Sequence, residues 1–284
     1  MPATAKQLAE TIATVPSLPA VLSRLTNAID DPRSSLRRIE AIVQEDSALA
    51  GRLLCLANSA YFGYPARVDN LSRAITLVGW RQLRDLTIAT SVIDTFRGLA
   101  PSQVTTESFW KHSVACGLVA RILATWRRES NLEQYFVAGL LHDIGRLVLY
   151  VKFPDDMSKV LGVARSSGKL LYQSEAEHLG FDHAAVGGEL LKRWNLPAHI
   201  HAGVEFHHAP QRAGAHKQMA AAVHIADILV NGIVCGSSGE RYVPSLCIEA
   251  WQSLDLPPSI VDKTLDLLER QLADALSVFL EDVG

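Results

Sequence analysis

The most chemically distinctive pair in the sequence is His142 and Asp143, an imidazole and a carboxylate side by side. The residues before them, 135–141, are almost wholly apolar, which indicates a helix buried on most of its circumference. A charged aspartate at the end of such a helix needs a positive partner. A metal ion would serve, because a histidine nitrogen with carboxylate oxygens suits zinc, iron, manganese or nickel better than calcium. The alternative is a metal-free Asp143 that caps a helix or pairs with Arg146.

The other histidines extend this prediction. The chain contains ten, several of them in helical patterns beside apolar residues. A single histidine on an apolar helix face is expected to be a core residue that is hydrogen-bonded to a carbonyl. Histidines and aspartates together could instead hold one or two divalent ions of iron, manganese, zinc or nickel. Read along the chain, the candidate ligands are His112, His142, Asp143, His183, His207, His208 and Asp227. His224 lies three residues before Asp227 on the same helical face, and we expect it to contact the metal ligands without binding the metal itself.

Two cations bridged by Asp143 would support a particular chemistry. They would lower the pKa of a shared water and hold phosphoryl oxygens, which is the usual route to phosphodiester hydrolysis. Arg146, one turn beyond His142, is predicted to lie in the same pocket and to neutralise a substrate phosphate. Asp143 and Arg146 are therefore the candidate catalytic residues. Lys192 and Arg193 are expected instead on a solvated face with helix salt bridges.

The order of these residues resembles the HD superfamily of metal-dependent phosphohydrolases, which hold a histidine, a His-Asp pair and a distant aspartate in a helical bundle. The matching residues are His112, His142, Asp143 and Asp227. The three further histidines resemble the second-metal ligands of the HD-GYP cyclic-di-GMP phosphodiesterases. Two features depart from that group: Arg146 stands where it has lysine, and Ala-Pro-Gln-Arg at 209–212 replaces its Gly-Tyr-Pro stretch.

The first half of the chain resembles the HDOD domain. The resemblance rests on the segment 16–22, the run Asn-Ser-Ala-Tyr-Phe-Gly at 58–63 and the run Ala-Ile-Thr-Leu-Val-Gly at 74–79, and it extends over about residues 8–210. It implies a regulatory output module of bacterial signal transduction, in a family whose enzymatic activity is generally not established. We therefore expect a module that binds a partner protein or a phosphorylated small molecule such as a nucleotide. The alternative is a metal-dependent phosphohydrolase that acts on a nucleotide or phosphoester.

Composition limits the other function classes. The 284 residues are 48% hydrophobic and 20% charged, and no apolar run approaches the roughly 20 residues of a membrane span. No leader peptide is expected, and four scattered cysteines argue against a disulfide framework and for a reducing cytoplasm. A helix-turn-helix at Gly79 and Trp80 would have arginines beside it, but a net charge of -3 lacks the basic footprint of a DNA-binding protein.

Apolar spacing predicts an all-α protein. Helices are expected over 20–30, around 36–43 and 49–56, over 184–194 with Asp182 as the N-cap, and over 259–280. The helix-breaking stretch at 98–103 predicts a boundary between an N-terminal helical subdomain, residues 1–100, and an HD-like helical subdomain with a helical extension, residues 101–284. Glycines and serines at 231–240 predict a mobile loop after the helix that carries Asp227.

Overall fold

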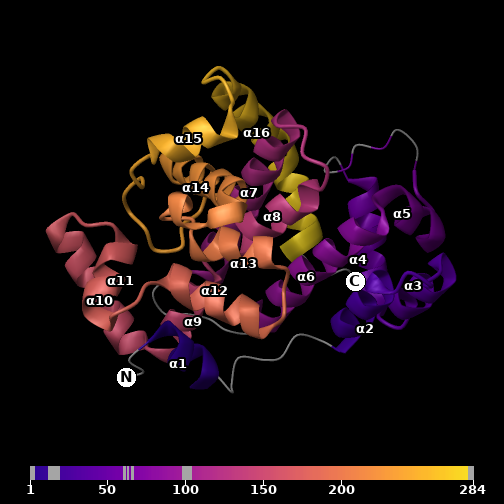
Figure 1. Ribbon diagram of the computed structural model, residues 1–284, viewed down its shortest axis with the longest axis horizontal. Helices are drawn as coiled ribbons and strands as arrows, with labels where there is room; N and C mark the ends of the chain where they lie inside the picture. Colours follow the sequence, from indigo (N-terminus) through magenta and orange to yellow (C-terminus); the bar gives the residue numbers. More distant parts are fainter. Residues whose placement is uncertain are drawn as a thin grey trace. The chain divides into compact units, whose positions relative to one another are not determined.

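A computed structural model describes residues 4–11, 20–59, 62, 64, 67–97 and 104–280. All regular secondary structure in these ranges is helical, which confirms the predicted all-α class (Figure 1). The chain divides into two compact units. One contains Met1–Pro16 and Arg97–Leu265, and the other contains Ser17–Phe96 and Asp266–Gly284. The predicted ranges were 1–100 and 101–284. By contrast, residues 1–16 are grouped with the later part of the chain, and residues 266–284 are grouped with the earlier part. The predicted boundary stretch, 98–103, lies outside the described residues.

The first unit contains all seven predicted ligands. Its elements are α1 (Ala5–Thr11), α7 (Thr106–Trp126), α8 (Leu132–Leu141), α9 (Ile144–Lys152), α10 (Pro154–Ser167), α11 (Leu171–Leu179), α12 (His183–Arg193), α13 (Ala198–Glu205), α14 (Lys217–Gly232), α15 (Ile248–Leu254), the short 3-10 turns Pro210–Arg212 and Gly214–His216, and the first residues of α16 (Ile260–Leu280).

Helices α7 and α8 pack against each other through glycines. A Cβ atom on Gly139 would lie 2.6 Å from the backbone oxygen of Cys116, and one on Gly117 would lie 2.8 Å from that of Phe136. Only glycine allows two helix backbones to approach this closely. Because both helices are buried along most of their length, their polar side chains are held at fixed positions in the core.

The start of α9 lies against the start of α12 in the same way. A Cβ atom on Gly145 would lie 2.0 Å from the backbone oxygen of His183. Asp182 is the N-cap of α12, as predicted, and its side chain accepts a hydrogen bond of 2.8 Å from the backbone N–H of Ala185. The close contact and the cap together fix His183 beside the His142–Asp143 turn.

Helix α14 packs on α7, α8 and α13, and residues 233–247 then lead from it to α15. We call residues 233–247 the closing loop. Ser238 of this loop is 1% exposed, and the hydroxyl of Tyr150 on α9 donates a hydrogen bond of 2.8 Å to the Ser238 carbonyl. The backbone N–H of Ser237 donates to the carbonyl of Ser108 on α7, at 3.1 Å. The sequence predicted a mobile loop here, but these bonds tie the loop to two helices of the core.

The second unit is a smaller helical assembly with its own core. It contains α2 (Ala20–Asp30), α3 (Leu36–Gln44), α4 (Ser47–Asn58), α5 (Leu71–Val78), α6 (Trp80–Arg97) and the remainder of α16. Most of the apolar positions that predicted its helices are buried, Leu25 and Ile39 completely, and Ile75 of the 74–79 motif is also fully buried. Of the family motifs, 16–19 lie outside the described residues, as do three residues of the run 58–63.

The turn between α5 and α6 contains the feature that suggested a helix-turn-helix. Gly79 adopts a positive φ of 92° and ends α5. Arg84 on the next helix forms ion pairs with Asp30 at 3.4 Å and with Asp85 at 3.2 Å, and its side chain is 12% exposed. It is therefore engaged within the unit.

Within the described ranges, no helix combines the length and the apolar character that crossing a bilayer requires.

Candidate metal centre

The seven predicted ligands converge inside the first unit. His112 lies on α7, His142 and Asp143 form the turn from α8 to α9, His183 begins α12, His207 and His208 follow α13, and Asp227 lies on α14. Four of the five histidines have no exposed surface, and His208 is partly exposed. The aspartates Asp143 and Asp227 are 2% and 4% exposed. Five chain segments thus bring imidazole and carboxylate groups together in the core.

One set of donors is formed by His112, His142 and Asp227, which we call the first group. The Nε2 atoms of His112 and His142 lie 3.4 Å and 3.5 Å from the same Asp227 oxygen, Oδ1. Cys116, one turn after His112, places its Sγ atom 3.6 Å from His112 Nε2. One ligand atom from each of these four residues lies within 4.8 Å of the others, so a single ion could be bound by this set.

A second set is formed by His183, His207 and His208, which we call the second group. His183 Nε2 lies 3.1 Å from His208 Nε2 and 3.4 Å from His207 Nε2. Tyr172 on α11 stacks on the His208 ring, with centroids 4.0 Å apart and planes 16° apart. The ligand atoms of these three histidines also lie within 4.8 Å of one another.

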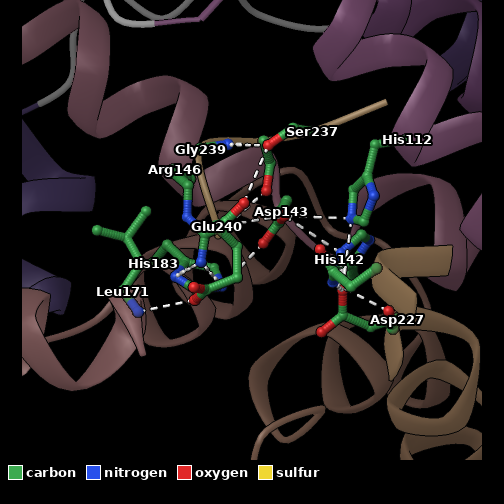
Figure 2. A network of polar contacts seen from close by, with 12 residues as sticks. His112, His142, Asp143, Arg146, Leu171, His183, Asp227, Ser237, Gly239 and Glu240 are labelled. Carbon is green, nitrogen blue, oxygen red and sulfur yellow. Dashed lines mark hydrogen bonds and ion pairs between the residues drawn. The ribbon is translucent and has the colours of Figure 1, made fainter. Parts of the chain in front are cut away.

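Asp143 stands between the first group and His183 of the second, as Figure 2 shows. Its Oδ2 atom lies 3.3 Å from His142 Nε2 and 3.8 Å from His112 Nε2, while Oδ1 lies 2.9 Å from His183 Nε2. Its two oxygens therefore face different groups. Asp143 is at the N-cap position of α9 but makes no side-chain capping hydrogen bond. Of the metal-free alternative, the capping hydrogen bond is therefore not seen, whereas the pairing with Arg146 is present at 3.1 Å.

The outer nitrogens of three imidazoles are fixed by acceptors behind them. His142 Nδ1 donates to the Gly139 carbonyl and His207 Nδ1 to the Val204 carbonyl, both at 2.7 Å. His183 Nδ1 lies 2.6 Å from a Glu175 oxygen. In each ring the Nε2 atom is thereby directed into the centre, an arrangement typical of metal-binding histidines. His142 Nε2 is buried without a hydrogen-bond partner, so the residues fit a metal ion that would satisfy this nitrogen.

The buried charges balance one another in a metal-free centre. Burial disfavours the charged form of His142, yet Asp143 and Asp227 raise its pKa to about 10. Burial and Arg146 likewise oppose the charge on His183, while Glu175 and Asp143 raise its pKa to about 9. Burial would raise the pKa of Asp143 and of Asp227, but the surrounding cations hold both well below the usual value. A divalent ion would supply positive charge in place of the imidazole protons, since metal ligands bind deprotonated.

The other two histidines of the second group are held neutral. Burial and the charges of His142 and His183 lower the pKa of His207 to about 3. The pKa of His208 falls well below its usual value for the same reason, with His207 and His183 as its neighbours. Their lone pairs are available to a metal without loss of a proton.

Arg146 lies in the pocket, as predicted, but all three of its nitrogens have partners in the protein. Nε donates to Glu175 at 3.1 Å, one terminal nitrogen donates to Asp143 at 3.1 Å and to the Ser238 hydroxyl at 2.5 Å, and the other approaches His183 Nδ1 at 2.9 Å. The side chain is 3% exposed. Its predicted role toward a substrate phosphate stays a prediction, and the geometry assigns its donors to Asp143, Glu175 and Ser238.

The residue series, the helical fold and this buried centre can now be compared with known proteins. The family model described as HDOD domain matches residues 15–210. The chain belongs to the HDOD domain family. The match ends before Asp227 and the closing loop, so both lie beyond the part of this HDOD protein that the family model covers.

Related proteins agree with the HDOD assignment. A solved HDOD domain protein with unknown function from Geobacter sulfurreducens superimposes with a TM-score of 0.82 at 22% identity, covering 97% of each chain. A Shewanella amazonensis SB2B protein, provisionally called a metal-dependent phosphohydrolase, has a TM-score of 0.65 at 20% identity and covers 97% of this chain and 99% of its own. At these identities the likeness shows the fold alone. An uncharacterized protein of Treponema pallidum (strain Nichols) is 28% identical over 228 residues, 80% of this chain and 44% of its own length. The present chain spans less than half of that relative.

Four residues of the centre were missed in the sequence. Cys116 could have been found, because it follows His112 by one helical turn and so shares its face. Glu175 and Tyr172 lie on α11, on a polar helix without any motif. Ser238 lies in a glycine-serine run that favours a loop and gives no sign of burial.

His224 and Lys192, which were also singled out in the sequence, lie in different surroundings. His224 Nδ1 donates to the His207 carbonyl at 2.8 Å, and its Nε2 accepts from the Cys247 backbone N–H at 3.0 Å. It thus joins the second group to the end of the closing loop, in the position expected for it. Lys192 forms salt bridges with Glu189 and Glu205 on the unit's surface, as expected of a solvated face.

Proposed function

We propose that this HDOD protein is a regulatory module of bacterial signal transduction whose state depends on a divalent transition metal held in the first unit. The observation that carries the proposal is the closure of the centre. An enzyme needs an open coordination position and a path for substrate. Here Arg146, itself 2% exposed, lies against Asp143 and His183, and Ser238 of the closing loop is buried against it.

The donor set supports a metal of the iron, manganese, zinc or nickel class. Imidazole nitrogens and carboxylate oxygens together suit these ions, whereas calcium and magnesium favour oxygen alone. Bound in the first group, such an ion would join α7, α8 and α14 through His112, His142 and Asp227. It would supply stability to the first unit because it binds only the folded arrangement.

The exposed side chains of the closing loop support the proposal that the module acts on a protein partner. Large hydrophobic side chains are exposed at eight positions in the described ranges. Five lie in the loop and a sixth follows it: Ile233, Val234, Tyr242, Val243, Leu246 and Ile248. Exposed apolar patches mark interaction surfaces. The inner side of this loop contacts Arg146 through Ser238, so a change at the centre would reach the outer side through one hydrogen bond.

Two measurements on one preparation test the proposal. The protein is purified without chelator and analysed for metals, and hydrogen exchange of residues 233–247 is compared before and after metal removal. We expect bound transition metal and faster exchange in the loop of the metal-free protein. Metal-free protein whose stability does not respond to added iron, manganese or zinc would contradict the proposal, as would loop exchange that ignores the metal.

A second candidate function is metal-dependent phosphohydrolysis. It is favoured by Asp143, whose two oxygens face the two histidine groups as a carboxylate bridging two ions would. A structurally similar protein is also provisionally called a metal-dependent phosphohydrolase. A panel of nucleotides and phosphoesters assayed with manganese or nickel separates the two functions. Robust cleavage that Asp143→Ala abolishes, with the fold intact, would establish the second function in place of the first.

A further inference from the structure

The second group already contains a cation that the protein supplies itself. The Arg146 guanidinium approaches both nitrogens of His183, at 2.9 Å from Nδ1 and 3.2 Å from Nε2. It is also 3.1 Å from Asp143 and 3.1 Å from Glu175. Figure 2 shows Arg146 and His183 on one side of Asp143, with His112, His142 and Asp227 on the other.

A metal ion in this group would lie beside the guanidinium. An ion bound to His183 Nε2 would be about 2.0–2.1 Å from that nitrogen. Arg146 is 3.2 Å from the same nitrogen, so the two cations would be within about 5 Å of each other in the buried core. Like charges this close repel strongly where water is excluded. Arginine cannot relieve the repulsion by losing its proton, as a histidine can.

Arg146 is also prevented from swinging away. It is held by Glu175 on α11, by Ser238 in the closing loop and by Asp143, all of them buried. Leaving the pocket would strand the Glu175 carboxylate, which is fully buried, without its arginine partner. The guanidinium is therefore a fixed part of the second group.

The first group has the opposite charge environment. Asp227 forms ion pairs with His112 and His142, and its Oδ1 atom also accepts a hydrogen bond of 2.6 Å from the neutral Asn231 amide. Among the described residues no lysine or arginine forms an ion pair with it. His142 Nε2 and His112 Nδ1 are both buried without a hydrogen-bond partner, and His142 Nε2 is the one that faces Asp143 and Asp227. A divalent ion here would lie beside two carboxylates. Asp227 has no arginine partner, whereas Asp143 is also paired with Arg146.

We infer that this chain binds a single metal ion, in the first group together with Asp143, and that Arg146 replaces the second ion of a two-metal centre. The inference rests on the proposed function, because it presupposes that the centre binds metal. It also gives the residue at position 146 a new role, as the cation that sets the number of ions rather than a ligand for substrate phosphate.

The test counts ions in three full-length proteins: wild type, Arg146→Met and Arg146→Lys. Each is saturated with Mn²⁺, freed of excess ion and analysed for metal per chain, and the electron paramagnetic resonance spectrum is recorded. We expect one ion with the spectrum of isolated Mn²⁺ in wild type and in Arg146→Lys, which keeps the charge. Arg146→Met should bind two ions, with the spectrum of an exchange-coupled pair.

Each outcome decides a separate point. Wild type with no ion overturns the proposed function and this inference together, whereas wild type with two ions overturns the inference alone. Arg146→Met with one ion also overturns the inference. If Arg146→Met does not fold by circular dichroism, the double variant Arg146→Met/Glu175→Gln removes both partners of the buried pair and takes its place, with the same expected count of two.

Discussion

The two groups of the centre are both rich in buried histidines but differ in charge. Each contributes three buried or nearly buried side chains, and each faces one oxygen of Asp143. The first group is completed by the carboxylate of Asp227, whereas the second is bordered by Arg146 and by the Glu175 that holds it. From this difference we expect unequal occupancy, because the fixed charges around a set of donors favour a cation in the first group and oppose one in the second.

The largest expected effect is that of Asp143→Ala, because this carboxylate contacts both groups and Arg146. We expect complete loss of bound metal. We also expect a loss of roughly 3 kcal/mol in the free energy of unfolding, since a buried guanidinium loses one of its two carboxylates. Elemental analysis and urea denaturation measure the two effects, with exposed Asp155→Ala as the control. An Asp143→Ala protein that keeps a full equivalent of metal would remove Asp143 from the centre.

A paired substitution then separates the groups. Loss of a residue that hydrogen-bonds to a metal ligand typically weakens metal binding by roughly 10–100-fold. His142→Ala removes a ligand itself and should weaken binding by more than this, whereas His208→Ala should weaken it by less than about tenfold. Both should leave the second unit folded, because His142 and His208 belong to the first. Metal titrations give the affinities, and hydrogen exchange over residues 20–59 reports on the second unit. Equal effects of the two substitutions would erase the distinction between the groups.

Removing the metal should have a moderate effect confined to the first unit. At a free metal concentration one hundred times the Kd, binding to the folded state stabilises it by about 2.7 kcal/mol. The free energy of unfolding should therefore fall by about this amount when the metal is removed by a chelator. In the His142→Ala protein, the free energies of unfolding with and without metal should be nearly equal. Identical unfolding curves for the wild type with and without metal would mean that the ion contributes nothing to folding.

The smallest expected effect concerns catalysis. With Arg146 engaged by Glu175 and Ser238, we expect no turnover of cyclic-di-GMP and at most weak hydrolysis of generic phosphoesters with manganese or nickel. Product analysis by chromatography after prolonged incubation provides the measurement. Turnover that rises with protein concentration and disappears in Asp143→Ala would show that the centre is catalytic and would favour the phosphohydrolase function.

Much of the centre could be predicted from the sequence, because its ligands interrupt apolar helices. His142 and Asp143 stand out after seven buried residues, and the later histidines follow in an order that matches a known superfamily. Helix α2 has the predicted bounds, and α16 begins one residue after the predicted start. Local spacing is sufficient for such features, since a helix repeats its face every three to four residues.

The partners of Arg146 could not be predicted for a physical reason. Glu175 is 29 residues away and Ser238 is 92 residues away, and neither lies in a pattern that shows what it contacts. The closing loop was misjudged for the same reason. Its glycines and serines favour turns, but its burial depends on Tyr150 and Arg146 from another helix. Tertiary contacts of this kind depend on the packing of α9 against α12 and on the path of the chain after α14.

Anomalous X-ray diffraction at the metal's absorption edge, on crystals of the wild-type protein, tests the central claim most directly. We expect one anomalous peak, among His112, His142, Asp143 and Asp227, with the Arg146 guanidinium in place beside His183. Two peaks, or a single peak among His183, His207 and His208, would contradict it.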